Sequence, residues 1–175
     1  AIAVQLALTL VEPQSSGIGG GAFILHWDRK QQKLTTFDGR ETAPQKAQPD
    51  IFLDQDGQAI PWIKAVVGGR SVGVPGVLSA LKMAHQQYGK LPWEALFEDA
   101  INLADSGFRV SPRLQKLVEL EFNPGLAELP EINQYFFPQG RPIRAGDKLK
   151  NPQLANVYRS LAKEGIKPFY QGWIA

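Results

Sequence analysis

The residues with the clearest chemical meaning lie in the stretch from Asp38 to Pro44. Arg40 offers a planar guanidinium whose N–H groups can bind a carboxylate through two parallel hydrogen bonds. Gly39 beside it leaves room for a ligand, and Asp38 and Glu41 could orient the guanidinium. The same pattern also fits an ordinary surface cluster of ion pairs. The residues alone therefore leave two interpretations of Arg40 open, a carboxylate-binding site and a solvated charge cluster.

Two glycine-containing motifs suggest other chemistries. Residues 17–22 fit the dinucleotide pattern G-x-G-x-x-G/A, but that pattern needs a strand before the loop and a helix after it, and the reverse order is expected here. Residues 69–73 fit the nucleophile elbow G-x-S-x-G of serine hydrolases. That mechanism needs an acid and then a histidine later in the chain, and only His85 follows, with no acid between. Both motifs are interpreted as structural connections, unless a segment outside the chain supplies the missing partners of Ser71.

The chain offers no convincing metal ligands or cofactor motif. His26 and His85 lie far apart and lack metal-ligand spacing, so each is predicted to be a packed or hydrogen-bonded structural group. Residues 54–57, Asp-Gln-Asp-Gly, resemble a calcium loop, but the glycine comes two positions early and no closing glutamate matches. We expect a tight turn there, no metal and no cofactor.

The positions of the apolar residues predict the elements that must hold Arg40. Apolar runs at 22–27 and 34–37 flank a charged turn, which predicts two strands with Arg40 just after the second. A nearly all-apolar segment, 1–11, is predicted to form a buried helix. Further helices are predicted from Pro75 to Gly89, from Pro92 to Asp105, from Ser111 up to Asn123, and from Pro152 to Lys163. Strands first and helices later predict an α+β fold.

Composition excludes several classes of function. Lys and Arg outnumber Asp and Glu by only 19 to 17, so the chain lacks the concentrated basic patch that nucleic acid binding needs. No apolar run approaches the ~20 residues of a membrane span. There is no cysteine, which excludes disulfides and thiolate chemistry. The length of 175 residues suits one domain, and the unbroken apolar segment at 1–11 suggests that residues 1–175 are one incomplete domain of a longer protein.

Several motifs together give a resemblance to a known family. They run in order along nearly the whole chain, and each would be weak alone. They are Glu12-Pro13-Gln14-Ser15-Ser16-Gly17-Ile18-Gly19-Gly20-Gly21-Ala22-Phe23, Asp38-Gly39-Arg40-Glu41-Thr42-Ala43-Pro44, Val72-Gly73-Val74-Pro75-Gly76-Val77, Tyr88-Gly89-Lys90-Leu91-Pro92-Trp93, Ala104-Asp105-Ser106-Gly107-Phe108 and Phe169-Tyr170-Gln171-Gly172. In these stretches the chain resembles the large subunit of the gamma-glutamyltransferase (gamma-glutamyltranspeptidase) family.

The resemblance implies an N-terminal-nucleophile hydrolase fold, a four-layer αββα arrangement of two stacked sheets between helices, of which only a portion lies in this chain. It implies a precursor that cuts itself into a large and a small subunit. The chain would be the N-terminal part of the large subunit, without its start or its C-terminal part. The small subunit's new N-terminal threonine would attack the γ-glutamyl amide of glutathione-like substrates. The family is periplasmic or secreted, which gives the expected location.

For the site, the resemblance implies that Arg40 binds the α-carboxylate of the γ-glutamyl group. It places no catalytic residue in this chain, so the polypeptide alone is expected to be inactive and to need the small subunit as partner. Two alternatives stay open: a cephalosporin-acylase-like amidohydrolase of the same superfamily, and a non-catalytic fragment that binds a partner chain. Arg40 does not separate the first alternative from the main hypothesis, because a glutaryl group also carries a carboxylate.

Overall fold

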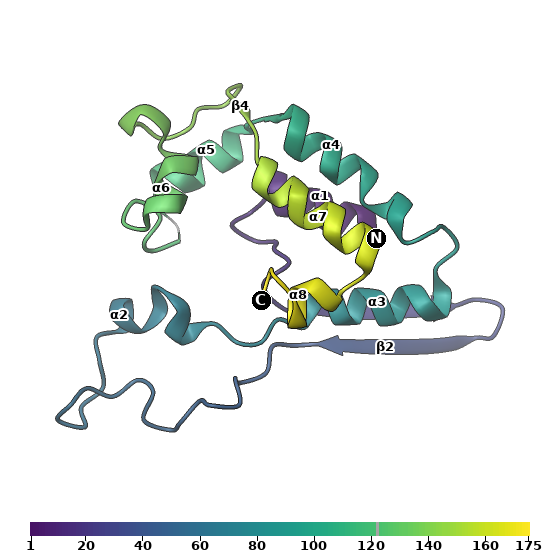
Figure 1. Cartoon of the computed structure of the whole chain (residues 1–175), viewed down its shortest axis with the longest axis horizontal. Coiled ribbons are helices and arrows are strands. Elements are labelled where there is room, and N and C mark those ends of the chain that lie inside the picture. Colours follow the sequence, from purple (N-terminus) through teal and green to yellow (C-terminus); the bar gives the residue numbers. More distant parts are fainter. Residues whose placement is uncertain (122) are drawn as a thin grey trace.

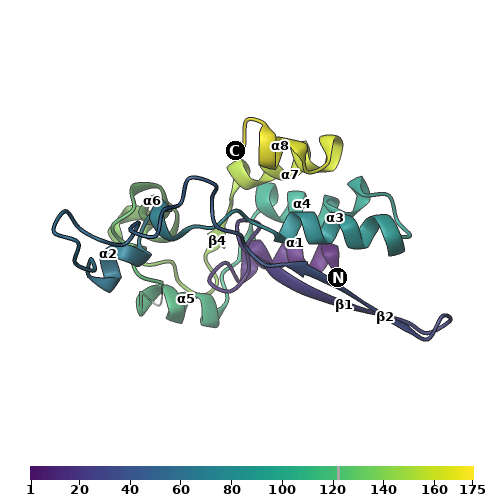
Figure 2. The ribbon, with the colours of Figure 1, turned by 90° about the horizontal axis from the view of Figure 1, so that it is seen from below.

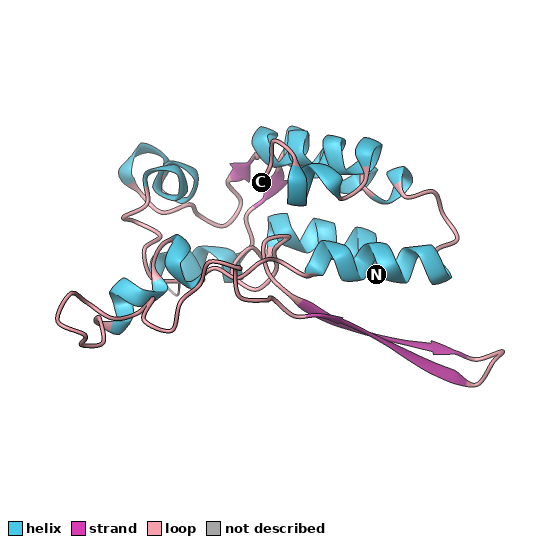
Figure 3. Ribbon diagram, turned by 60° about the horizontal axis from the view of Figure 1, so that its bottom comes forward, coloured by secondary structure: helices cyan, strands magenta, loops and turns pink. Residues whose placement is uncertain are grey.

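A computed structural model describes residues 1–121 and 123–175 of the chain. Most of its helices gather on one side of a long β-hairpin (Figure 1), and the other face of the hairpin is open (Figure 3). No helix among the described residues has the length and apolar character to cross a membrane. The mixture of helices and short antiparallel sheets confirms the α+β prediction.

The helices and strands follow the chain in this order: α1 (Ile2–Val11), β1 (Ala22–Asp28), β2 (Lys33–Gly39), α2 (Trp62–Val66), α3 (Val77–Tyr88), α4 (Glu98–Ser106), β3 (Phe108–Arg109), α5 (Pro112–Glu119), α6 (Pro130–Phe136), β4 (Lys148–Leu149), α7 (Pro152–Glu164) and α8 (Lys167–Gln171). Short 3-10 turns occupy Gly69–Ser71, Glu94–Leu96 and Pro138–Gly140. The described strands form two separate pairs, β1 with β2 and β3 with β4. The two stacked sheets that the resemblance implies are therefore not contained in the described part of this chain.

The β1–β2 hairpin has two faces of different character. The strands pair antiparallel, with Ile24 opposite Phe37 and Trp27 opposite Leu34. Because side chains alternate along a strand, Ile24 and Phe37 face α3, and Phe37 is buried. On the opposite side the apolar side chains of the "outer face" remain exposed; we define it by Phe23, Leu25, Trp27 and Leu34. Figure 2 shows the β1–β2 hairpin extending along the layer of helices and past its end.

The main core lies between α1, α3, α4 and α7. Its centre is an aromatic series in which the Phe97 ring contacts Trp93 on one side and Tyr158 on the other, each edge to face. The polar tips of the two outer rings are satisfied, since the Trp93 indole N–H donates to the Leu161 carbonyl at 2.9 Å and the Tyr158 hydroxyl donates to the Leu6 carbonyl at 3.0 Å. We call this assembly the helical body. Its buried aromatic rings have partners for their polar atoms, as is usual for buried Trp and Tyr.

A second core cluster continues from the helical body toward α5 and the β3–β4 pair. Leu114 and Val118 of α5 pack there with Phe108 and Ile143. The Ser111 hydroxyl accepts a hydrogen bond from the Leu114 amide at 3.0 Å and so caps the N-terminus of α5. Asn151 caps α7 in the same way, through the Leu154 amide.

Several predicted elements differ from those observed. Helix α1 is not buried all round, because only Leu6 and Leu10 are enclosed. The predicted helix from Pro92 to Asp105 is a 3-10 turn followed by α4, which begins at Glu98. The helix after Ser111 ends at Glu119, short of the prediction. Helices α6 and α8 are absent from the sequence prediction. Each has a proline in its first turn, and proline is equally common in turns and loops, so it did not identify a helix by itself.

Candidate active site

Arg40 lies directly after β2, on a segment that is fixed at both ends. At one end Gly39 is the last residue of β2 and pairs with Ala22. At the other end Thr42 and Val74 exchange backbone hydrogen bonds of 2.8 and 3.3 Å. The sequence prediction that Arg40 stands at the tip of the second strand is confirmed. The guanidinium therefore projects from a backbone with little freedom to shift.

Gly39 serves a different purpose from the one expected. A Cβ atom at this position would lie 2.7 Å from the Cβ of Ala80 and 3.0 Å from the carbonyl oxygen of Gly76. The missing side chain therefore makes room for α3 and the segment before it, not for a ligand. This close approach brings α3 against the end of β2, where Arg40 begins.

The two neighbouring acids also divide their roles. An oxygen of the Asp38 carboxylate accepts a hydrogen bond from the backbone N–H of Arg40 at 2.9 Å, so Asp38 fixes the turn and not the guanidinium. Glu41 lies 3.8 Å from the Arg40 side chain, at the outer limit of an ion pair. The Arg40 side chain is 73% exposed. Exposed pairs of this kind contribute little, so most of the hydrogen-bonding capacity of Arg40 is free for a ligand.

Two glycines from distant parts of the sequence pack closely against Glu41. A Cβ atom on Gly21 would lie 2.5 Å from one Glu41 carboxylate oxygen, and one on Gly73 would lie 2.8 Å from the Glu41 Cβ. Gly21 belongs to the glycine loop before β1, and Gly73 follows the 3-10 turn at Gly69–Ser71. Both glycine motifs therefore have a structural role beside Arg40. The sequence does not predict these contacts, because β1 and β2 separate Gly21 from Glu41 and α2 separates Glu41 from Gly73.

Arg40 borders an open groove of about 550 Å³. The groove is lined by the β2–Arg40 segment, the start of α3 and helix α8, through Asp38, Gly39, Arg40, Thr42, Val74, Pro75, Gly76, Ser79, Ile166, Lys167, Tyr170 and Gln171. Arg40 and Lys167 give the groove two cationic side chains, and the one acid, Asp38, already accepts from a backbone N–H. An anionic group of a small molecule would be stabilised there, with Arg40 able to bind a carboxylate in two parallel bonds.

Tyr170 joins the two walls of this groove and was not assigned a role from the sequence. Its hydroxyl lies 2.7 Å from the Pro75 carbonyl oxygen, to which it donates, and 3.3 Å from the Ser79 amide, from which it accepts. Burial raises the pKa of Tyr170, so the hydroxyl remains protonated and able to donate at neutral pH. The signal in the sequence was the motif Phe169-Tyr170-Gln171-Gly172, which marked the resemblance but gave no contact.

The other candidate motifs have structural roles. The Ser71 hydroxyl donates to the Val66 carbonyl at 2.7 Å, and helix α2 precedes it where a nucleophile elbow needs a strand. His26 stacks on Tyr88 with ring centres 3.8 Å apart, and His85 bonds the Leu91 carbonyl at 2.8 Å. Both predictions for the histidines are confirmed.

The remaining two motifs also follow the sequence prediction. Asp54 accepts from the amides of Asp56 and Gln58, which confirms a turn. In the glycine loop a helix enters and a strand leaves, as expected. Across residues 1–121 and 123–175, no group of three or more acidic or histidine side chains is placed to hold a metal ion.

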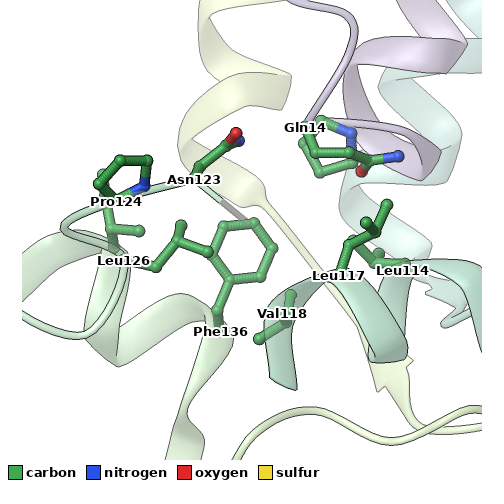
Figure 4. A pocket seen from close by; sticks show the side chains of 10 residues that line it. Gln14, Leu114, Leu117, Val118, Asn123, Pro124, Leu126 and Phe136 are labelled. Atoms are coloured by element: carbon green, nitrogen blue, oxygen red, sulfur yellow. The ribbon is translucent and has the colours of Figure 1, made fainter. Parts of the chain in front are cut away.

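A separate pocket of about 240 Å³ shares no lining residue with the groove of Arg40. Figure 4 shows Gln14 and Asn123 at its edge and apolar side chains such as Leu117, Val118 and Phe136 around the rest. Its lining contains no charged side chain. It cannot bind a carboxylate as Arg40 can, so the groove beside Arg40 is the better candidate site.

Comparisons with known proteins identify the family to which the chain is similar. The sequence profile described as gamma-glutamyltranspeptidase matches residues 1–175. The glutathione hydrolase proenzyme of Bacillus subtilis strain 168 is 37% identical over 175 residues, which is 100% of this chain and 30% of that protein. The chain thus spans about a third of the length of the curated relatives it matches.

Solved structures agree on the fold. The gamma-glutamyltranspeptidase of Helicobacter pylori superposes with a TM-score of 0.91 at 30% identity, covering 99% of this chain and 49% of that one. A cephalosporin acylase from Bacillus halodurans superposes with a TM-score of 0.81 at 31% identity, covering 98% of this chain and 32% of that one. The chain has the fold of one portion of these N-terminal-nucleophile hydrolases. Since the profile matches its whole length, the chain belongs to the gamma-glutamyltranspeptidase family.

Proposed function

We propose that the protein containing this chain transfers the γ-glutamyl group of glutathione and related amides to water or to amino acids. Arg40 would bind the α-carboxylate of the γ-glutamyl group. The observation that carries this proposal is the largely exposed guanidinium of Arg40, held on a backbone fixed at both ends and bordering a groove with a second cation, Lys167. The similarity to a glutathione hydrolase proenzyme supports the choice of acyl group.

The reacting groups would come from outside residues 1–175. In this proposal the N-terminal threonine of a small subunit, released when the precursor cuts itself, is the nucleophile. Its α-amino group accepts the hydroxyl proton as the oxygen attacks the amide carbon. The amine leaves with a proton, and water or an amino acid then takes the acyl group from the threonine ester. The chain's contribution is to hold the donor by its carboxylate, so that the amide reaches the threonine in a fixed position.

The outer face of the hairpin supports a partner from the same precursor. Phe23, Leu25, Trp27 and Leu34 present a row of apolar side chains, each more than half exposed in this chain. Such a contiguous apolar surface is typical of a protein interface. We propose that the rest of the precursor, including the small subunit, covers it. We also propose that the chain is part of the large subunit and that the complete protein is periplasmic or secreted.

A second candidate acyl group follows from the likeness to the Bacillus halodurans cephalosporin acylase. Arg40 would bind the terminal carboxylate of a glutaryl group equally well, because the guanidinium recognises only the carboxylate. A glutaryl amide differs from a γ-glutamyl amide in lacking the α-amino group. Comparing kcat/KM for a γ-glutamyl and a glutaryl amide of the same amine in the complete protein separates the two. We expect the γ-glutamyl amide to be preferred.

The test of Arg40 is an Arg40→Lys variant of the complete protein, assayed with γ-glutamyl-p-nitroanilide. Lysine keeps the charge but loses the paired geometry, so we expect KM to rise about ten-fold or more with a smaller change in kcat. Arg29→Lys in the exposed hairpin turn is the matched control and should leave KM unchanged. An unchanged KM in Arg40→Lys would contradict the proposal.

The chain alone is expected to be inactive. Purified 175-residue polypeptide should not release p-nitroaniline from γ-glutamyl-p-nitroanilide, because the proposed nucleophile lies outside it. Turnover by the chain would show that a nucleophile lies within it and would contradict the proposal that the nucleophile lies outside residues 1–175. The third candidate, a non-catalytic fragment that binds a partner chain, predicts inactivity in the complete protein as well.

A further inference from the structure

We propose that Tyr170 is a positioning residue for Arg40, an inference that rests on the proposed role of Arg40 in binding the donor carboxylate. Tyr170 is on α8, far along the chain from Arg40. Its hydroxyl joins α8 to the segment Pro75–Gly76 through the Pro75 carbonyl at 2.7 Å. That segment in turn lies against the backbone of Arg40, so the position of the guanidinium depends on this hydroxyl.

The contact between Gly76 and Arg40 is the closest step in this path. A Cβ atom on Gly76 would lie 2.3 Å from the Gly39 carbonyl oxygen, 2.6 Å from its carbonyl carbon and 2.8 Å from the Arg40 carbonyl oxygen. The backbone of Gly76 is therefore packed directly on the peptide that joins Gly39 to Arg40. Closely packed groups transmit displacement, so a shift of Pro75–Gly76 moves the start of Arg40.

Pro75–Gly76 is held from two sides. On one side the Gly20 carbonyl accepts hydrogen bonds from the amides of Gly76 and Val77, each at 3.1 Å. On the other side the Tyr170 hydroxyl donates to the Pro75 carbonyl and accepts from the Ser79 amide at 3.3 Å. Removing the hydroxyl leaves the Pro75 carbonyl without this donor and frees the segment on the side of the groove.

The Arg40 side chain has no comparable support of its own. Its ion pair with Glu41 is long, at 3.8 Å, and the side chain is largely exposed. The backbone therefore fixes the point from which the guanidinium extends, and the side chain adds little constraint of its own. A hydroxyl that fixes this backbone would act on capture of the donor and not on the later chemical steps. It touches no reacting atom in the proposed reaction, which separates it from a catalytic residue.

The experiment compares Tyr170→Phe with Tyr158→Phe in the complete protein. Both variants keep the ring and remove one hydroxyl that donates to a backbone carbonyl, Pro75 in one case and Leu6 in the other. Both should lower the melting temperature slightly. Only Tyr170→Phe should raise KM for γ-glutamyl-p-nitroanilide, by about five-fold, which corresponds to one hydrogen bond, with kcat within about two-fold.

Arg40→Lys is measured in the same assay, so that the two proposals fail separately. If Arg40→Lys raises KM and Tyr170→Phe does not, the positioning role of Tyr170 is wrong and the role of Arg40 stands. If Arg40→Lys leaves KM unchanged, the proposed function is wrong, and the positioning role falls with it whatever Tyr170→Phe does. A KM change in Tyr158→Phe equal to that in Tyr170→Phe would reduce the effect to general destabilisation and also overturn the inference.

Discussion

The helical body and the β-hairpin differ in how far their apolar side chains are exposed to solvent. In the helical body Phe97 is 0% exposed, and its ring lies between Trp93 and Tyr158. In the hairpin Phe23 is 62% exposed, and its neighbours on the outer face are similarly open. The helical body buries its aromatic centre within this chain, although Val4 of α1 and Met83 of α3 stay exposed, whereas the hairpin has covered only the face that meets α3. The site of Arg40 lies where these two regions join.

The outer face of the hairpin is therefore the apolar surface that the proposed partner would cover. Burying apolar area stabilises a fold by about 25 cal/mol per Å². Because the outer face of the hairpin is exposed in this chain, its side chains do not contribute this stabilisation here. Arg40, at the end of β2, is held by the helical body through Gly39, Gly76 and α3. Its backbone is thus fixed by contacts with the helical body, while its side chain is largely exposed and borders the groove between β2, α3 and α8.

The largest effect is expected from Phe97→Ala in the helical body. The substitution removes a fully buried ring at the centre of the aromatic series and leaves a cavity. We expect a loss of about 3–5 kcal/mol in the free energy of unfolding. Denaturant unfolding of the complete protein measures it. A loss below about 1 kcal/mol would show that this core is loosely packed.

The next effect tests whether the outer face is covered in the complete protein. Leu25 and Leu91 are exposed to a similar extent in this chain, 68% and 62%. Leu25 lies on the outer face, and Leu91 lies in the loop after α3. If the rest of the precursor packs on the hairpin, Leu25→Ala should cost about 2–3 kcal/mol and Leu91→Ala less than about 0.5 kcal/mol. Equal, small losses would mean that the outer face stays in water.

A smaller effect concerns the hydroxyl of Tyr158 and depends on pH. Burial raises the pKa of Tyr158 to about 12, against about 10 in the unfolded chain. Between these values the unfolded state loses its proton first, so folding stability falls as pH rises from about 10 to 12. At pH 7 Tyr158→Phe should cost about 1 kcal/mol, through the lost bond to the Leu6 carbonyl.

By pH 11 the wild-type protein loses about 1 kcal/mol that the Phe variant does not lose. The difference between wild type and Tyr158→Phe should therefore nearly vanish at that pH. Unfolding free energies of both proteins at pH 7, 9 and 11 measure this. Tyr135, whose pKa burial also raises to about 12, is unchanged in both proteins and so cancels in the comparison. A difference that stays constant with pH would contradict the predicted ionisation.

The sequence predicted those parts of the fold whose signals are local. Apolar runs around a charged turn predicted β1 and β2, and the helices predicted from Ser111 and from Pro152 begin within one residue of α5 and α7. The strands β3 and β4 have only two residues each, which is too few to show a periodic pattern in the sequence. The burial of α1 was overestimated, because apolar composition predicts what a helix needs and not what this chain supplies.

The site divides in the same way. The position of Arg40 at the end of a strand followed from local pattern, and its largely exposed guanidinium is consistent with the carboxylate-binding interpretation. The purpose of Gly39 was predicted wrongly, since its close neighbour Ala80 belongs to another element. The contact of Tyr170 with Pro75 spans 95 positions. Contacts of this kind arise from packing in three dimensions, which neither composition nor spacing encodes.

The smallest effect concerns the hydrogen bond that fastens the hairpin to the helical body. The hydroxyls of Thr35 on β2 and Tyr88 on α3 lie 2.6 Å apart, and the Tyr88 ring also stacks on His26. Thr35→Val keeps the branched shape and removes this bond, so we expect a loss of about 0.5–1 kcal/mol. A double-mutant cycle with Tyr88→Phe should give a coupling energy of similar size.

The control for this cycle is Thr36→Val, which changes the same residue type on the opposite side of β2. Thr36 points away from α3, so its cycle with Tyr88→Phe should show no coupling. Equal coupling in both cycles would mean that the substitutions act on the whole hairpin and not on one contact. Coupling confined to Thr35 would show that the hairpin is joined to the helical body by a specific contact as well as by apolar packing.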